Sequence, residues 1–252
     1  MQSLPPTQTA QINGRALEYI TSGSGSPTIV LINGAGGPLA GWHRVYADLE
    51  ALSTVFAYNR PGIGGSDRPD IPQTGDVIVT ALHELLAAAG MPPPYVLVGH
   101  SLGGLYANLF ARRYVDTVAG IVFLEAAAPG DTVLNDQHQT FVQKTLNGIF
   151  GIFSRRDPNA EVEWVQETVK QIEAAGPFPD VPLTVISGGK RPPRLFMSEA
   201  AYRIRADNQR SLAGLSAQGE QVIAAKSGHF PQFAEPEVIV SAIRDMIARI
   251  RS

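Results

Sequence analysis

The sequence predicts an α/β fold: a doubly wound, mostly parallel eight-stranded sheet with a small helical cap. Short apolar runs alternate with helical patterns along most of the chain. The central runs are apolar at nearly every position, as in strands that are covered on both faces. Strands joined through helices pair in parallel, because a parallel crossover needs about a helix of intervening chain. With 252 residues, 44% of them hydrophobic and 17% charged, the chain can build one large core.

The strands are predicted in order from the N-terminus. Asn13-Gly14 separates the first two, and this dipeptide favours a two-residue hairpin turn. The six runs that follow are short and rich in β-branched residues, which suits buried strands. The eight predicted strands cover residues 8–12, 17–21, 28–32, 55–58, 95–98, 121–124, 183–186 and 222–225.

Three helices are predicted between and after these strands. Residues 76–89 repeat apolar side chains at helical spacing. Residues 102–114 are apolar over most of their surface, which predicts a deeply buried helix. Residues 236–251 begin with Pro236, which is favoured in a first helical turn, and they again carry apolar residues at helical spacing.

One long stretch interrupts the alternation of strand and helix. Residues 125–182 are too many for a bare loop, and helices are expected over about 132–150 and 161–175. We interpret this stretch as a small helical cap over one end of the sheet. The chain then divides into a core, residues 1–127 and 180–252, and a cap insert, residues 128–179.

Composition argues against several classes of partner. The formal net charge is −3, which favours neither nucleic acid nor an anionic membrane surface. The N-terminus lacks the basic and apolar regions of a signal peptide. No apolar run approaches the roughly 18 residues of a membrane span. We therefore expect a soluble, cytoplasmic monomer or homodimer with no nucleic-acid or membrane partner.

No cofactor or metal is expected. The chain has no cysteine, which excludes disulfides, thiolate chemistry and cysteine-ligated metals. The Gly34-Ala35-Gly36 segment begins like a dinucleotide fingerprint, but Leu39 stands at the third glycine position. The His, Asp and Glu residues show no metal-ligand spacing.

The strongest chemical motif follows the predicted strand at 95–98. That strand runs into Gly99-His100-Ser101-Leu102-Gly103 and then into a helix. A Gly-x-Ser-x-Gly turn in this context holds its serine in a strained conformation that exposes the hydroxyl, and glycines avoid collisions beside it. The start of the helix suits a developing oxyanion. Ser101 is the predicted nucleophile, and the alternative is a serine in a glycine-rich turn without chemistry.

On this and three further motifs the chain resembles the α/β-hydrolases over nearly its full length. Residues 31–37, Leu-Ile-Asn-Gly-Ala-Gly-Gly, lie where the family has a His-Gly loop, with Asn33 in place of the histidine. Residues 60–67 resemble the family's turn after its fourth strand, and Ser-Gly-His-Phe at 227–230 resembles its catalytic-histidine loop. The resemblance implies an oxyanion hole formed by the backbone N–H groups of Ala35 and Leu102.

A serine hydroxyl needs a base that takes its proton, and five histidines compete for this role. His43, His83 and His138 lie in segments that suggest structural places, and His100 is expected to point away from the nucleophile. His229 follows the last predicted strand, where parallel sheets build their sites. A nucleophile first and a histidine last is also the chain order of this fold. His229 is therefore the predicted base.

The acid of the triad is not at its usual place. Most relatives carry it after the strand that here is 183–186, but this sequence continues Ser-Gly-Gly-Lys-Arg. Glu125 ends the preceding strand, where a subset of the family, similar to some haloalkane dehalogenases, has its acid. Those enzymes use an aspartate nucleophile, so Ser101 argues against dehalogenation. Glu125 is predicted to orient and stabilise the histidine, unless it pairs with a cap residue instead. Two other carboxylates remain open as alternatives: Asp131 and Asp207.

These residues predict a serine hydrolase that transfers an acyl group to water. A carboxylic ester is the default substrate, and a lactone, thioester or activated amide stays open. The apolar cap favours a small, fairly hydrophobic substrate, with Phe150, Phe153 and Trp164 as candidate contacts. The alternatives are a cofactor-free perhydrolase or lyase, or a ligand-binding protein of this fold without catalysis.

Overall fold

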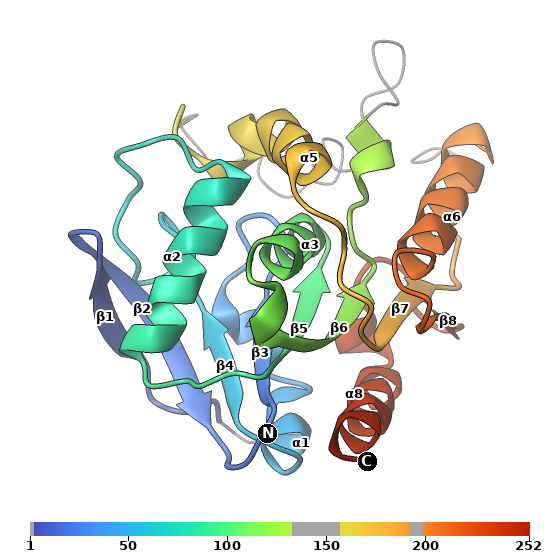
Figure 1. Cartoon of the computed structure of the whole chain (residues 1–252), viewed down its shortest axis with the longest axis horizontal. Coiled ribbons are helices and arrows are strands. Elements are labelled where there is room, and N and C mark those ends of the chain that lie inside the picture. Colours follow the sequence, from blue (N-terminus) through green and yellow to red (C-terminus); the bar gives the residue numbers. More distant parts are fainter. Residues whose placement is uncertain (1–2, 133–156, 192–198) are drawn as a thin grey trace.

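The computed structural model describes residues 3–132, 157–191 and 199–252. Eight strands form one sheet in the order β1-β2-β4-β3-β5-β6-β7-β8 (Figure 1). The pairs β1·β2 and β2·β4 are antiparallel and the other five are parallel. The strands are β1 (Gln8–Ile12), β2 (Arg15–Ser22), β3 (Thr28–Ile32), β4 (Val55–Tyr58), β5 (Tyr95–His100), β6 (Val118–Leu124), β7 (Leu183–Gly188) and β8 (Gly219–Ala224). The predicted fold class is confirmed.

The turn between β1 and β2 has the geometry that its sequence predicts. Asn13 and Gly14 have φ of 51° and 78°. Positive φ at both central residues is the requirement of a type I′ turn, whose twist matches that of the two strands it joins. Ile12 and Arg15 therefore pair directly across the hairpin.

Helices cover both faces of the sheet (Figure 1). The three predicted helices are present as α2 (Gly75–Ala88), α3 (Gly103–Arg113) and α8 (Pro236–Arg251), with ends within one residue of those expected. The remaining helices are α1 (Tyr46–Glu50), α5 (Val165–Ala174), α6 (Glu199–Ala213), α7 (Pro231–Ala234) and the short 3-10 helices η1 (Leu39–Trp42), η2 (Val115–Thr117), η3 (Pro129–Thr132) and η4 (Glu161–Trp164).

The core is divided between the two faces of the sheet. On one face Val30 and Ile32 pack with residues of α2, α3 and α5. On the other face Ile29 and Leu31 pack with residues of α1 and α8. Successive residues of a strand point to opposite faces, so a strand covered on both sides must be apolar throughout. This explains the continuous apolar run of β3.

The predicted cap is described only in part. Most of the expected helix at 132–150 lies outside the described residues. The expected helix at 161–175 is divided into η4 and α5. Val169 and Ile172 of α5 are buried and belong to the core cluster that α2 and α3 also form. The division into a core of 1–127 and 180–252 and a cap of 128–179 stays a prediction.

The start of α3 approaches β3 so closely that position 103 has no room for a side chain. A Cβ on Gly103 would overlap the carbonyl oxygen of Ile32 and lie 2.5 Å from that of Asn33. We expect Gly103→Ala to lower the free energy of unfolding by about 1–3 kcal/mol, because backbone must move to admit the methyl group. Urea unfolding of wild type and variant measures the difference.

Gly176→Ala is the matched control, because a Cβ there has nothing within 4 Å. Its unfolding curve should lie close to that of the wild type. Equal losses of stability in the two variants would contradict the close approach of α3 and β3.

Candidate active site

Ser101 occupies the turn between β5 and α3 with a left-handed backbone, φ 50°. Its N–H donates to the carbonyl of Leu124 at 3.2 Å, and its own carbonyl accepts from the N–H of Ala127 at 2.8 Å. A non-glycine residue in this region is strained and persists only where the surroundings hold it. The last residue of β6 and the chain that follows it provide those restraints.

His229 lies in the loop between β8 and α7, and its ring is next to Ser101. The distance from His229 Nε2 to Ser101 Oγ is 3.1 Å. The loop is held by Glu235, whose Oε2 accepts from Lys226 N and from Ser227 Oγ, both at 2.7 Å. Lys226 and Ser227, which precede the histidine, are therefore bound directly to the segment that leads into α8.

Glu125 is on the other side of the His229 ring. Its Oε2 is 3.3 Å from His229 Nδ1, and its Oε1 accepts from the N–H of Gly188 at 2.6 Å. Glu125 also has a left-handed backbone, φ 45°, and its N–H donates to the carbonyl of Ile186. The carboxylate that follows β6 thus reaches the end of β7.

The protonation states follow from these contacts. Burial alone would raise the pKa of Glu125, but the guanidinium of Arg205 and the hydrogen bonds from His229 and Gly188 lower it to about 2. An ionised carboxylate only accepts, so His229 Nδ1 carries the proton and Nε2 presents its lone pair to Ser101. Burial lowers the pKa of His229; the hydrogen bond to Glu125 opposes this and Arg205 adds to it.

His100, which the sequence predicts to be structural and to point away from the nucleophile, is a neighbour of His229. Its ring centre is 5.0 Å from that of His229, and its Nε2 donates to the backbone carbonyl of His229 at 2.9 Å. Burial, followed by the nearby His229, lowers the pKa of His100 to about 3, so the ring is neutral. A histidine directly before the nucleophile was the available signal, but its direction depends on the tertiary structure.

The glycine-rich loop after β3 passes directly beside the serine. A Cβ on Gly34 would lie 3.1 Å from the Cβ of Ser101 and 3.0 Å from His100 Nδ1. Within the described parts of the chain, the N–H groups of Ala35 and Leu102 donate to no acceptor of the protein. Two backbone donors are therefore available in the two segments that flank Ser101.

A buried ion pair holds this loop from behind. Arg60 donates to the carbonyls of Asn33 at 2.8 Å and Gly34 at 2.6 Å, and it pairs with Glu161. Glu161 also accepts from the N–H of Gly36 at 2.9 Å. The Arg60 side chain is 1% exposed and that of Glu161 9%. Sequence reasoning noticed Arg60 only as part of a turn motif and had no signal for Glu161, whose partner lies 101 residues away.

The two alternative acids are engaged elsewhere. Asp131 accepts from the N–H of Ala128 at 2.8 Å and from Asn208 Nδ2 at 2.6 Å. Asp207 forms an exposed ion pair with Arg210 on α6. The structure thus brings Ser101, His229 and Glu125 together and gives both aspartates other partners.

The remaining predicted residues are only partly described. His138, Phe150 and Phe153 lie outside the described residues. Trp164 is half-buried in η4 and its Nε1 donates to the carbonyl of Pro158 at 2.9 Å. It lies in the same short helix as Glu161, which binds the loop beside the serine.

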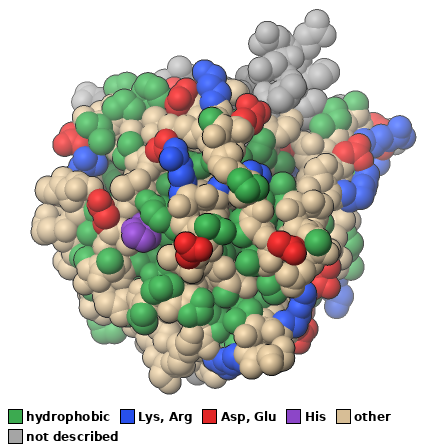
Figure 2. Space-filling view, viewed as in Figure 1, with side chains coloured by type: hydrophobic (Ala, Val, Ile, Leu, Met, Phe, Trp, Pro, Cys, Tyr) green, Lys and Arg blue, Asp and Glu red, His purple; other side chains and the backbone are tan. Residues whose placement is uncertain are grey.

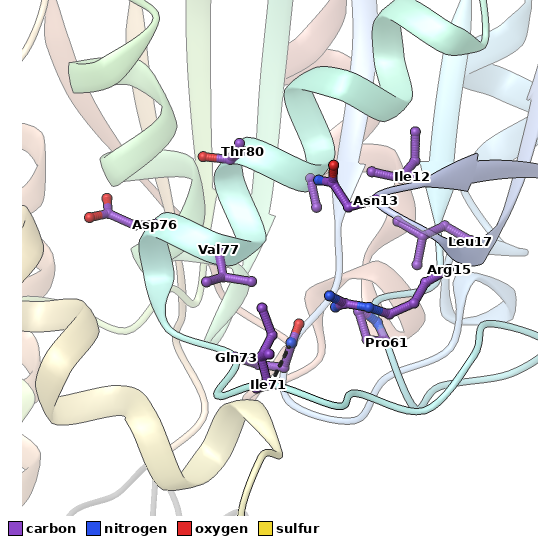
Figure 3. Close-up of a pocket in the computed structure, with 11 residues that line it drawn as sticks. Ile12, Asn13, Arg15, Leu17, Pro61, Ile71, Gln73, Asp76, Val77 and Thr80 are labelled. Atoms are coloured by element: carbon purple, nitrogen blue, oxygen red, sulfur yellow. Dashed lines mark hydrogen bonds between the residues drawn. The ribbon is translucent and has the colours of Figure 1, made fainter.

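A pocket of about 340 Å³ lies in another part of the molecule. Figure 3 shows the residues that line it, which come from the β1–β2 hairpin, the start of α2 and the chain before α2. None of the predicted site residues lines it. Its walls are Ile12, Asn13, Arg15, Leu17, Pro61, Ile71, Gln73, Asp76, Val77, Thr80 and Ala81. The volume is typical of small-molecule sites, but this pocket lies apart from the serine chemistry.

The described parts of the chain were compared with three kinds of site: a charged surface, a membrane span and a metal centre. Figure 2 shows basic and acidic side chains interspersed among hydrophobic and neutral ones on one face. Among the described residues, no helix has the length and apolarity needed to cross a bilayer. The same ranges contain no group of three His, Asp or Glu side chains that could hold a metal ion.

The buried ion pair behind the glycine-rich loop should matter for stability. In Glu161→Gln the guanidinium of Arg60 stays buried without its counter-charge, so we expect the free energy of unfolding to fall by about 3–5 kcal/mol. Glu167→Gln is the control, because its partner Lys170 is exposed and such pairs contribute about 0–1 kcal/mol. Indistinguishable urea unfolding curves for the two variants would refute the expected difference.

Comparison with known proteins identifies the family of this chain. Residues 29–242 match the sequence model of the alpha/beta hydrolase family. The chain is 30% identical over 253 residues to the uncharacterized protein YqjL of Bacillus subtilis (strain 168), covering 98% of this chain and 94% of that protein.

Solved structures give the same result for the fold. Cfl2 from Burkholderia cenocepacia superposes with a TM-score of 0.72 at 20% identity, covering 95% of this chain and 94% of that one. A serine hydrolase involved in carbazole degradation, the CarC enzyme, superposes with a TM-score of 0.64 at 21% identity, covering 97% and 99%. At these identities the likeness concerns the fold, and the family follows from the sequence match: the chain belongs to the alpha/beta hydrolase family.

Proposed function

We propose that the protein is a serine hydrolase that cleaves a carboxylic ester, lactone or thioester through an acyl-enzyme. The observation that carries the proposal is the continuous contact from Ser101 Oγ through His229 to Glu125, with distances of 3.1 and 3.3 Å. Membership of the alpha/beta hydrolase family supports it. The similarity of fold to the CarC serine hydrolase agrees with it.

In the first half-reaction Ser101 Oγ attacks the carbonyl carbon of the substrate. His229 Nε2 takes the hydroxyl proton as the new C–O bond forms, and the carbonyl electrons move onto oxygen. Glu125 stays ionised, holds Nδ1–H, and stabilises the imidazolium that results. The tetrahedral adduct then expels the alcohol or thiol, which receives the proton from His229.

The oxyanion of each tetrahedral adduct is assigned to the N–H groups of Ala35 and Leu102. Removing one such donor costs roughly 10²–10³ in kcat in enzymes where it has been tested. The ion pair of Arg60 and Glu161 supports this assignment, because it holds the carbonyls of the residues that precede Ala35. The loop is therefore held in shape before substrate binds.

The second half-reaction releases the acid. A water molecule attacks the acyl carbon while His229 takes one of its protons, and the serine oxygen recovers the proton when the adduct collapses. The proposed cap at 128–179 would form the substrate-facing side of this site. Trp164 is the predicted substrate contact within the described residues, and it favours a small, fairly hydrophobic acyl or alcohol group.

The nucleophile can be tested by covalent labelling. We expect a fluorophosphonate to label the wild type at Ser101, and Ser101→Ala to lose both the label and the hydrolysis of p-nitrophenyl esters. Ser211→Ala is the control, because Ser211 is exposed on α6. Intact-protein mass spectrometry identifies the adduct.

The outcomes separate the competing functions. A folded wild type that takes no label favours a ligand-binding protein without catalysis and removes the serine hydrolase proposal. Label together with peracid formation in the presence of peroxide, but little hydrolysis, favours a perhydrolase. An ester series of increasing acyl length, with lactones and thioesters beside it, identifies the preferred substrate class.

The acid can be tested by isosteric substitution. We expect Glu125→Gln to lower kcat by roughly 10²–10⁴-fold, because the neutral amide no longer fixes the tautomer of His229 or stabilises its charged form. Asp131→Asn and Asp207→Asn are matched controls that should retain near-normal turnover. Circular dichroism establishes that each variant is folded at the assay temperature. Normal turnover in Glu125→Gln, with a collapse in either control, would transfer the role to that aspartate.

A further inference from the structure

Arg205 is a buried cation beside the proposed triad. It lies on the inner face of α6, and its side chain is 10% exposed. Its Nη2 forms an ion pair with Oε2 of Glu125, the same oxygen that faces His229, and also donates to the backbone carbonyl of Glu125 at 3.3 Å. Sequence reasoning assigned this arginine no role, since 80 residues separate it from Glu125.

The surrounding face of α6 binds the same segment of chain. Gln209 Nε2 donates to the carbonyl of Ala126 at 2.7 Å, and Asn208 Nδ2 donates to Asp131 at 2.6 Å. Asn208 and Gln209 follow Arg205 by about one turn of α6. Arg205 therefore comes from a helix that is anchored to the chain after β6 at several points.

We propose that Arg205 is a positioning residue of the site, and that its charge keeps His229 in the neutral, base-competent form at lower pH than Glu125 alone would allow. This proposal rests on the serine hydrolase function proposed above. The role of Arg205 concerns the charges that face His229, whereas the serine hydrolase function concerns Ser101 and the reaction.

Three buried groups of the site can carry a charge: Glu125, His229 and Arg205. With Glu125 ionised and His229 neutral, Arg205 brings the sum of these three groups to zero, so a proton on His229 creates a net positive charge. Without Arg205 the sum would be −1, and the same proton would neutralise it. In a poorly solvated site the first change is less favourable than the second.

Among residues 3–132, 157–191 and 199–252, the other groups that face His229 carry no charge. His100 contacts it from the end of β5 and is neutral, with a pKa of about 3. Ser101 presents a hydroxyl. The ionised neighbours in the described part of the chain are Glu125, which follows β6 and raises the pKa of His229, and Arg205 from α6, which lowers it. Burial acts in the same direction as Arg205.

The same ion pair has a second consequence for Glu125. A buried carboxylate without a cation takes up a proton more readily and can then no longer stabilise an imidazolium. Arg205 is the first of the groups that hold the pKa of Glu125 at about 2 against the effect of burial. It therefore maintains the charge of the acid while it limits the basicity of the histidine.

The test is the pH dependence of fluorophosphonate labelling in wild type, Arg205→Gln and Arg205→Lys. Labelling falls as pH falls through the pKa of His229, because a protonated imidazole cannot take the serine proton. We expect the wild-type midpoint to lie below the usual histidine value of 6.5. Arg205→Gln should move it upward by about 1 pH unit, the effect of one nearby charge. Arg205→Lys, which keeps the charge, should leave it near that of the wild type.

Arg210→Gln is the matched control, since Arg210 is an exposed arginine on the same helix, and its midpoint should not move. An unchanged midpoint in a folded Arg205→Gln overturns the proposal, because the charge of Arg205 would then have no effect on His229. A lowered midpoint also overturns it, because displacement of Glu125 would lower the pKa of His229. Should Arg205→Gln not fold, an upward shift of about 1 pH unit in Arg205→Lys overturns the proposal, because that variant keeps the charge. Absence of label in the wild type instead refutes the serine hydrolase function.

Discussion

The carboxylate of Glu125 is the point at which four parts of the chain meet. It leaves β6, accepts the N–H of Gly188 at the end of β7, pairs with Arg205 of α6, and contacts His229 from the loop after β8. A buried carboxylate needs such partners, because an unpaired charge in a poorly solvated interior is strongly unfavourable. The carboxylate of Glu125 thus links β7, α6 and the histidine loop at one place beside Ser101.

A second buried ion pair, Arg60 with Glu161, holds another loop beside the serine. Arg60 and Glu161 join the loop after β3 to the first turn before α5. A buried ion pair adds little net stability compared with apolar residues of similar size, but loss of one partner is strongly destabilising. Both pairs thus define the positions of loops at the carboxyl ends of the strands, while the apolar clusters on the two faces of the sheet supply the stabilisation.

The backbone at the site is strained where those loops converge. Ser101 and Glu125 both have positive φ and lie at the ends of neighbouring strands, β5 and β6. The N–H of Ser101 donates to the chain just before Glu125, and the N–H of Glu125 donates to β7. Each strained residue is therefore held by the next strand of the sheet, so the site depends on the strand order rather than on any one turn.

Local pattern was sufficient for the eight strands and for α2, α3 and α8, whereas α1 and the bounds of α6 were not predicted. Each of β3 and β4 is a short apolar run, and its bounds coincide with those expected; the Asn13-Gly14 turn and α8 carry their own end signals. Ser101 and His229 were identified from motifs within a few residues of each, and Glu125 from the absence of an acid after β7. Their roles stay a proposal, although the structure brings the three side chains together.

What the sequence by itself determined is therefore whatever depends on neighbours along the chain: strand and helix periods, turn residues, and the serine turn. Only the tertiary structure decided that His100 binds the backbone of His229, that Arg60 meets Glu161 101 residues away, and that Arg205 meets Glu125 80 residues away. The physical reason is that a charge buried by folding is matched by another charge brought near in space, and no local period records which one.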